Sequence, residues 1–320
     1  MDKSMSVTVK LAILLLFALI FGATMIAFSV KDRETSYADR HFFDKSKSYE
    51  KKFTVSSGDK LVLEADLGDV VVTGTDGEEL SVKVTANGSD ENLSKYDVQF
   101  DQDGNTVRIR GKHSRRYFHF FDNDWMEVRY EITLPKNFNL ELNTSGGDLN
   151  LRDIQGNIYG ETSGGDVAAN NLSGKIHCTT SGGNIVLKNS SGELDFRTSG
   201  GDIHGDAING SMQVETSGGN IDMRNSDGQI YASTSGGDIE VELKDNKGIN
   251  LSTSGGNIKI SLPKTISGKV SASTTGGDVS CDFPFSGKIK DGNMNGTING
   301  GGNLIEAETS GGDITIIGNE

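Results

Sequence analysis

One acidic or amide side chain recurs at a fixed place in a five-residue motif, Thr-Ser-Gly-Gly followed by Asp or Asn. Copies of this corner motif end at Asp148, Asp166, Asn184, Asp202, Asn220, Asp238, Asn257 and Asp313, and a Thr-Thr-Gly-Gly-Asp variant ends at Asp278. Repeated carboxylates beside glycines could bind Ca²⁺, which prefers oxygen ligands. Several copies carry neutral Asn, however, and the spacing of calcium-binding nonapeptide repeats is absent. We therefore interpret these side chains as turn caps for backbone N–H groups, and we predict no metal site.

Catalysis would need carboxylates, histidines or nucleophiles that converge on one face. The positions two residues after the successive motifs instead change character from copy to copy: Asn150, Ala168, Val186, His204, Asp222, Glu240 and Lys259. Asp222 and Glu240 form the best carboxylate pair, but such a pair is typical of a solvated surface. His177 and His204 lack the spacing of metal ligands and are interpreted as surface residues. We predict no catalytic residue, no cofactor and no enzyme activity; a polysaccharide-acting enzyme is the less favoured alternative.

The Ser and Thr columns of the motif must point to opposite sides if a strand runs through them. A flat array of hydroxyls could bind a carbohydrate or an ice surface. The favoured alternative is that both hydroxyls bond to the backbone at a corner, as Ser and Thr often do.

A segment rich in aromatic residues and Arg includes the single Trp of the chain. Interfaces favour these residue types, so the segment could be an interaction tip. The apolar end of a repeat stack must also be covered, and we favour this capping role. The residues of the alternative interaction tip are Arg115, Arg116, Tyr117, Phe118, Phe120, Phe121 and Trp125.

The motif recurs every 18 residues from Asp148 to Asp238 and is followed by alternating apolar and polar residues, the pattern of half-buried strands. One predicted inward column is Leu149, Val167, Ile185, Ile203, Ile221, Ile239, Ile258 and Val279, and a second is Ile158, Ile176, Leu194, Met212, Ile230, Ile249, Val270 and Ile289. The paired glycines are expected to supply positive φ angles at the corners. These patterns predict an all-β fold for residues 143–320: a β-solenoid, similar to a right-handed parallel β-helix, with coils of about 18 residues. Either two or three strands per coil fit the pattern.

The region before the regular repeats divides into four segments. Residues 1–10 form a short tail, and residues 11–30 are uncharged and long enough to span a bilayer, as a transmembrane helix or signal anchor. Residues 31–50 suit a juxtamembrane linker. Residues 51–142 are β-rich and are expected to form an entry and capping module, in which residues 64–70 resemble a degenerate copy of the motif. The net charge of −14 disfavours a nucleic-acid partner.

The run Ile132-Thr133-Leu134-Pro135 and the motif copies that follow it resemble the bacterial putative-adhesin domain family, a domain family of unknown function, over about residues 53–318. The resemblance implies a β-solenoid behind an N-terminal membrane segment. We therefore expect a non-catalytic adhesin or structural protein of the bacterial envelope, anchored by one helix in the cell membrane with its β-domain on the extracytoplasmic side. The expected partners are the membrane and surface glycans or another envelope protein. The alternative function is an envelope-stress regulatory protein that binds a membrane partner.

Overall fold

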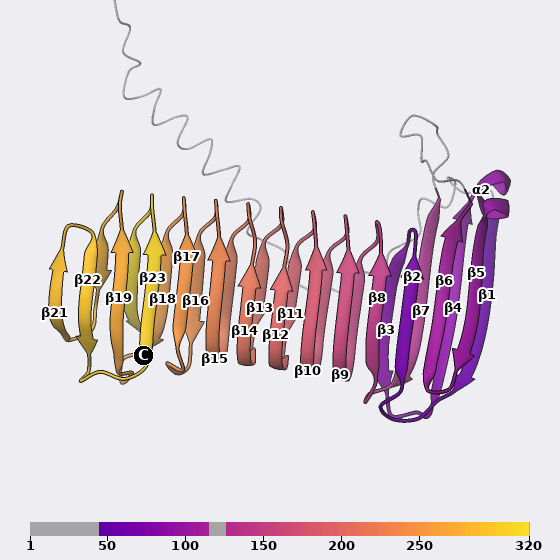
Figure 1. Cartoon of the computed structure of the whole chain (residues 1–320), viewed down its shortest axis with the longest axis horizontal. Coiled ribbons are helices and arrows are strands. Elements are labelled where there is room, and N and C mark those ends of the chain that lie inside the picture. Colours follow the sequence, from indigo (N-terminus) through magenta and orange to yellow (C-terminus); the bar gives the residue numbers. More distant parts are fainter. Residues whose placement is uncertain (1–44, 115–125, 320) are drawn as a thin grey trace, which may run out of the picture. The chain divides into compact units, whose positions relative to one another are not determined.

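The computed structural model describes residues 45–114 and 126–319, which form a stack of β-strand coils (Figure 1). The chain divides into a unit of residues 1–42 and a unit of residues 43–320, and all described residues belong to the second unit. Each coil, here called a rung, places one strand in each of two layers. We name the layer formed by the strands that precede the corner motifs the front sheet, and the layer formed by the strands that follow them the back sheet. The regular rungs therefore have two strands each.

The front sheet, in order of pairing, contains β5 (Tyr96–Asp103), β6 (Thr106–His113), β2 (Lys60–Ala65), β8 (Asn139–Thr144), the second halves of β9 (Leu149–Thr162) and β10 (Val167–Thr180), β12 (Ser191–Arg197), β14 (Asn209–Glu215), the second half of β15 (Ile221–Thr234), β17 (Ile249–Thr253), β23 (Leu304–Thr309), β19 (Gly268–Thr274), β22 (Asn293–Ile298) and β21 (Phe285–Lys290). The back sheet contains β1 (Lys45–Thr54), β4 (Glu79–Gly88), β7 (Glu127–Pro135), β3 (Asp69–Thr75), the first halves of β9 and β10, β11 (Ile185–Lys188), β13 (Ile203–Asp206), the first half of β15, β16 (Ile239–Leu243), β18 (Ile258–Pro263), β24 (Ile314–Asn319) and β20 (Val279–Cys281). A short helix, α2 (Asp90–Lys95), joins β4 to β5.

The apolar columns predicted from the alternation form the core between the two sheets. In the first column the seven residues from Leu149 to Ile258 are at most 1% exposed, and in the second the seven from Ile158 to Val270 are at most 3% exposed. The two C-terminal members differ. Val279 is only half-buried, and the prediction for Ile289 is wrong, because this side chain is 52% exposed on the antiparallel hairpin β21–β22.

Chain order and stacking order differ at the C-terminal end. Strand β23 pairs with β17 on one side and with β19 on the other, and β24 lies between β18 and β20 in the same way. The rung that carries Asp313 is therefore inserted between the rungs of Asn257 and Asp278. Ile305 and Ile314 of the inserted rung occupy places in the two core columns and are fully buried.

The N-terminal module is built partly as a rung. The region expected to be β-rich contains six strands, β2 to β7. Strands β2 and β3 stack directly on β8 and β9, and Gly68 O accepts a hydrogen bond from Thr144 at 3.1 Å. Residues 64–70 are therefore a copy of the corner motif, as the sequence indicated. Beyond this rung the sheets continue through antiparallel pairs, β5 with β6 and β4 with both β7 and β1.

The segment predicted to span a membrane, residues 11–30, lies outside the described residues, as do the tail before it and residues 31–44. Strand β1 begins at Lys45, within the segment assigned to the linker. Across residues 45–114 and 126–319, no helix is long and apolar enough to cross a bilayer.

Candidate interaction surfaces

The Thr of each corner motif is buried and bonds to the neighbouring rung. The hydroxyl of Thr216 donates to Gly201 O at 2.8 Å and accepts from Gly219 N at 3.3 Å. The same bond to a glycine carbonyl is made at all nine motif corners, by Thr144, Thr162, Thr180, Thr198, Thr216, Thr234, Thr253, Thr309 and Thr274. The backbone bonding expected for the hydroxyls is therefore confirmed for the Thr column.

The paired glycines serve a different purpose from the one predicted. None of the motif glycines has a φ in the left-handed region; such angles occur instead at the second corner of each rung, for example at Asn171 and Gly174. A Cβ on the second glycine of a motif would lie too close to the preceding rung, only 2.0 Å from Gly201 O in the case of Gly219. The second glycine is therefore needed because adjacent backbones approach closely.

The Asp/Asn column forms a ladder of side-chain to backbone hydrogen bonds. Nine consecutive bonds of 2.6–3.0 Å run from each residue's backbone N–H to the Oδ1 atom of the preceding rung, in the order Asp69, Asp148, Asp166, Asn184, Asp202, Asn220, Asp238, Asn257, Asp313 and Asp278. These side chains are thus backbone caps, as predicted, but each caps the next rung and not its own turn. Both Asp and Asn supply the Oδ1 acceptor, which explains why either residue is accepted. Of the residues that the structure describes, no three His, Cys, Asp or Glu side chains are grouped to hold a metal ion.

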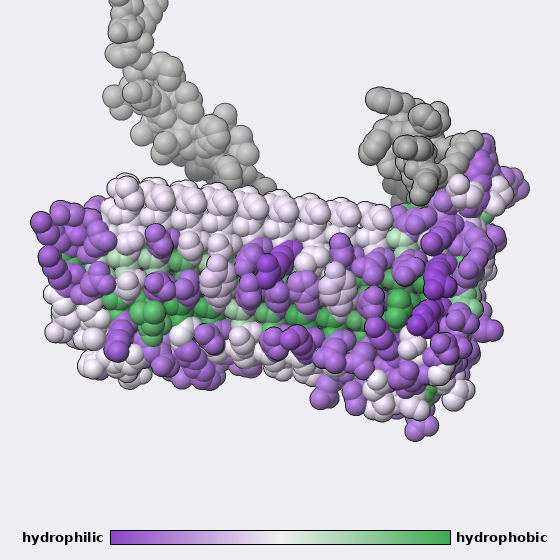
Figure 2. Space-filling view, in the orientation of Figure 1, coloured by the Kyte–Doolittle hydropathy of each residue, from purple (hydrophilic) through white to green (hydrophobic). Residues whose placement is uncertain are grey.

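The Ser of each motif faces solvent on the same edge. Eight exposed serines, each followed by an exposed glycine, form what we call the serine ridge: Ser145, Ser163, Ser181, Ser199, Ser217, Ser235, Ser254 and Ser310. Figure 2 shows this edge as a continuous band of nearly neutral hydropathy. No hydrogen bond joins these hydroxyls to another described residue. The opposite orientation of Ser and Thr is therefore confirmed, and the ridge hydroxyls are available to a ligand.

A second surface lies on the outer face of the front sheet. The rings of Tyr159 and His177 stack with centroids 5.3 Å apart, and His177 Nδ1 lies 2.9 Å from Asp195 Oδ2. Arg197 donates two hydrogen bonds to the same carboxylate, at 2.8 and 3.2 Å. An open groove of about 910 Å³ runs beside Tyr159 and is also lined by Lys60. An aromatic wall beside charged groups suits a polar ligand with apolar faces better than it suits bond-breaking chemistry.

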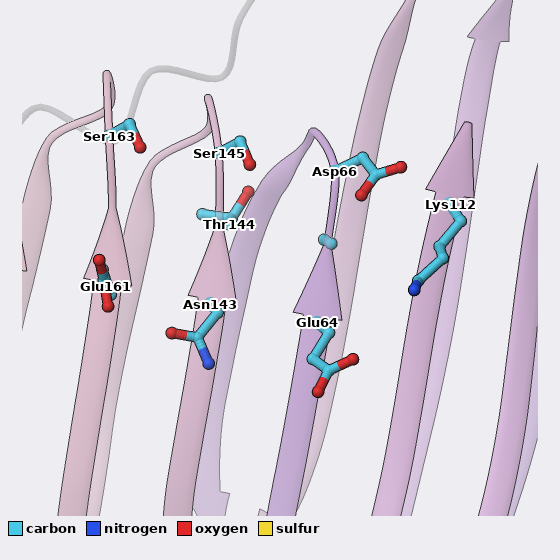
Figure 3. A pocket seen from close by; sticks show the side chains of 9 residues that line it. Glu64, Asp66, Lys112, Asn143, Thr144, Ser145, Glu161 and Ser163 are labelled. Atoms are coloured by element: carbon cyan, nitrogen blue, oxygen red, sulfur yellow. The ribbon is translucent and has the colours of Figure 1, made fainter. Parts of the chain in front are cut away.

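A smaller pocket of about 290 Å³ lies where the N-terminal module meets the first regular rungs (Figure 3). Glu64, Asp66 and Glu161 contribute carboxylates to it, and Lys112 contributes an amine. Asp66 Oδ2 already accepts a hydrogen bond from the backbone N–H of His113 at 2.9 Å. The pocket is shallow and polar, and no nucleophile paired with a base is among its lining residues.

Asp222 and Glu240, the best carboxylate pair in the sequence, both form ion pairs with cationic side chains. Asp222 Oδ2 lies 2.7 Å from Arg224 and 3.3 Å from His204, and Glu240 pairs with Lys259 at 2.6 Å. Burial by itself would raise the pKa of Asp222, but hydrogen bonds from His204 and Arg224 outweigh it and lower the pKa. A carboxylate with a lowered pKa is a poor general acid at neutral pH.

The two cysteines are free thiols in different surroundings. Cys178 is buried in the core, and this burial raises its pKa to about 12. Cys281 is only half-buried because it lies on the last strand of the back sheet. The proposed interaction tip, from Arg115 to Trp125, lies outside the described residues, between β6 and β7.

Comparisons with known proteins assign the chain to a family. Among solved structures, the chain is similar to a putative adhesin from Bacteroides fragilis, with 17% identity, 85% of this chain and 97% of that chain covered, and a TM-score of 0.41. It is also similar to a putative cell adhesion protein from Clostridium sporogenes (14%, 85% and 99%, TM-score 0.26) and to a putative lipid binding protein from Parabacteroides distasonis (13%, 84% and 96%, TM-score 0.36). No curated protein matches the chain. The family model described as Toastrack DUF4097 matches residues 58–317, and the chain therefore belongs to this family of β-solenoid-like proteins.

Proposed function

We propose that this protein is a non-catalytic adhesion protein of a bacterial cell envelope. Residues 11–30 anchor it in the cell membrane, and the β-stack is displayed on the outer side. The serine ridge is the observation that carries this proposal: it offers an exposed, unpaired hydroxyl on each of eight rungs along a single edge. Many weak contacts at a constant spacing suit an extended polymer such as a surface polysaccharide, because linked weak contacts reach high avidity.

The use of the remaining polar groups supports a binding role. The motif Thr and Asp/Asn side chains hold neighbouring rungs together, and Asp222 and Glu240 are occupied by cationic partners. Chemistry at these positions would have to break contacts that stabilise the stack. The hydroxyls of the ridge can bind a ligand without any such loss.

A four-fold ridge variant tests the binding role in the full-length chain. Ser181, Ser199, Ser217 and Ser235 are changed to Ala, and attachment of expressing cells to immobilised surface polysaccharides is measured. The control variant changes four serines on the outer face of the front sheet, Ser211, Ser233, Ser252 and Ser271, to Ala. We expect attachment to fall by about tenfold or more only in the ridge variant, since each lost contact multiplies in its effect. Equal attachment by both variants contradicts a role for the ridge.

Labelling of intact cells tests the display. Ser235→Cys places an exposed thiol on the ridge, in a background with Cys281→Ser to remove the half-buried thiol. A membrane-impermeant maleimide should label this variant on intact cells as fully as in detergent. Labelling that requires detergent would place the β-stack on the inner side and refute the display.

A further inference from the structure

The two sheets do not end together at the C-terminal end of the stack. The last complete rung consists of β19 and β20, and the front sheet continues past it with the hairpin strands β22 and β21 (Figure 1). The back sheet ends at β20. Within the described residues, β20 pairs only with β24 and β21 pairs only with β22. The end of the stack therefore has the form of a step two strands deep, bounded by two unpaired strand edges.

Apolar side chains line the inner face of this step. Ile289 of β21 has the same parity as Met294, its buried partner on β22, but is 52% exposed because β21 is the last strand of the front sheet. Val279 and Cys281 of β20 and Phe285 of β21 are half-buried and pack against the core. The core is thus left partly open at this end.

At the opposite end of the stack, the edge of the back sheet is protected against strand addition. This edge is β1, a ten-residue strand that carries Lys45, Lys47, Lys51 and Lys52. Exposed lysines on an edge strand are a common protection against pairing with another chain. Only the C-terminal step combines unpaired edges with exposed apolar surface among the described residues.

The shape of the step is complementary to itself. A two-fold axis parallel to the strands exchanges front and back sheets, so that the two overhanging strands of one copy fill the gap left by the back sheet of the other. In this arrangement β21 of each copy lies beside β20 of its partner and runs antiparallel to it. We propose that the C-terminal step is a homodimerisation surface, in which two copies of this chain join end to end by these two strand pairings and bury Ile289 of both.

The charges along the two edges agree with this pairing. Lys288 and Lys290 lie on the outer face of β21, and Asp278 and Asp282 flank β20; all four are exposed. Because the axis preserves strand direction, Lys290 at the corner end of β21 meets the partner copy's aspartate at the corner end of β20. Lys290 now has only a surface contact with its neighbour Asp291, at 3.3 Å. The two-fold axis repeats each pair of opposite charges, and these pairs favour this register of β21 and β20 over other registers.

The dimer gives the proposed adhesion a specific partner, and this part of the inference depends on the proposed function. If the stack is displayed outside the cell, chains anchored in two different cells can join through their C-terminal steps. This second contact between cells is homophilic and adds to the polysaccharide binding proposed for the serine ridge. The dimer itself requires only the step and does not depend on where the chain is located.

Charge exchange tests the dimer in solution with the full-length chain in lipid nanodiscs that hold one chain each. The acidic variant is Lys288→Glu with Lys290→Glu, and the basic variant is Asp278→Lys with Asp282→Lys. We expect each variant alone to self-associate about tenfold or more weakly than wild type, and an equal mixture of both to associate as strongly as wild type. Asp278 is the last residue of the side-chain ladder and accepts no bond in it, so its change leaves the ladder intact.

A second pair of variants separates docking from folding. Ile289→Ser should weaken association by about tenfold or more, whereas Leu304→Ser, which changes a residue 45% exposed on β23, should leave it unchanged. A wild-type chain that stays monomeric at about 100 µM, or folded variants that associate like wild type, would overturn the proposal. Association that needs Ile289 but occurs only with a different co-purified protein would also overturn it, because the partner would not be a second copy.

Mixed populations of cells test the homophilic contact. Cells that express the acidic variant should aggregate with cells that express the basic variant, but neither population should aggregate with itself. Loss of labelling at Ser235→Cys on intact cells, with dimers still present in nanodiscs, would refute the proposed display and leave the dimer standing. Normal labelling on intact cells with no charge-dependent association would refute the dimer and leave the proposed display standing.

Discussion

The two glycines of one corner motif should respond in opposite ways to the same added methyl group. A Cβ at position 219 would lie 2.0 Å from Gly201 O, and real Cβ contacts essentially never fall below 3.0 Å. The two rungs must therefore separate by about 1 Å, which breaks the bond from the Thr216 hydroxyl to Gly201 O and the bond from Asn220 N–H to Asp202 Oδ1 of the preceding rung. Two lost hydrogen bonds at about 1 kcal/mol each, with about 1–3 kcal/mol of overpacking, give a loss of about 3–5 kcal/mol in the free energy of unfolding for Gly219→Ala.

Gly218→Ala is the matched control. The nearest atoms to a Cβ at position 218 are 3.7 Å away, and the residue faces solvent. This change should be neutral or stabilising by up to about 1 kcal/mol, since Ala reduces the freedom of the unfolded chain. At about 2 °C or more per kcal/mol, Gly219→Ala should lower the Tm by about 6 °C or more, measured by circular dichroism. A Tm for Gly219→Ala within about 2 °C of that for Gly218→Ala would refute the explanation by close backbone approach.

Three further predictions concern the corners and the thiols. Burial, with added repulsion from the aspartates of the two adjacent rungs, raises the pKa of Asp148. Asp148→Asn should therefore raise the Tm by about 1–3 °C at pH 7. The gain should vanish as the pH falls below the unfolded pKa of about 4, because the Asp148 carboxyl of the wild type is then neutral as well. Thr216→Val should cost about 1–3 kcal/mol in urea unfolding, because it leaves a buried carbonyl without its donor, whereas Ser217→Ala should change stability by less than about 0.5 kcal/mol. Thiol titration of the native chain should modify Cys281 slowly and Cys178 only after unfolding, and equal rates for both would contradict the assigned burial.

The regular part of the fold could be predicted because one period governs it. The 18-residue step and the alternation after each motif determine which side chains face inward, so both core columns were identified from Leu149 to Ile258 and from Ile158 to Val270. The likeness of residues 64–70 to the motif, and not the period, identified them as a degenerate copy. The bonding role of the Asp/Asn column followed from residue type, although its direction, from one rung to the next, required the structure.

The irregular end could not be predicted for the same reason. Every motif copy has nearly the same strand edges, so the sequence pattern does not determine the order in which the rungs stack. Chain order placed Ile289 and Val279 at the end of the core columns, whereas the structure places Ile305 and Ile314 in the stack before the last rung. Sequence also cannot distinguish a glycine required for a positive φ from one required for close backbone approach, since both reasons exclude a side chain.

The inserted rung determines the order in which this end of the protein can be completed. Residues 268–281 are synthesised before residues 304–319, yet they stack on strands formed by that later segment. A nascent chain can add rungs one after another up to β18, but the next position in the stack stays empty until residue 319 has been made. The chain must then place its last two strands beside β17 and β18 before β19 and β20 have a partner. Completion of the C-terminal end is therefore a single concerted step, and a chain that is cut before Leu304 would expose the apolar edges of β17 and β18 to whatever strand reaches them first.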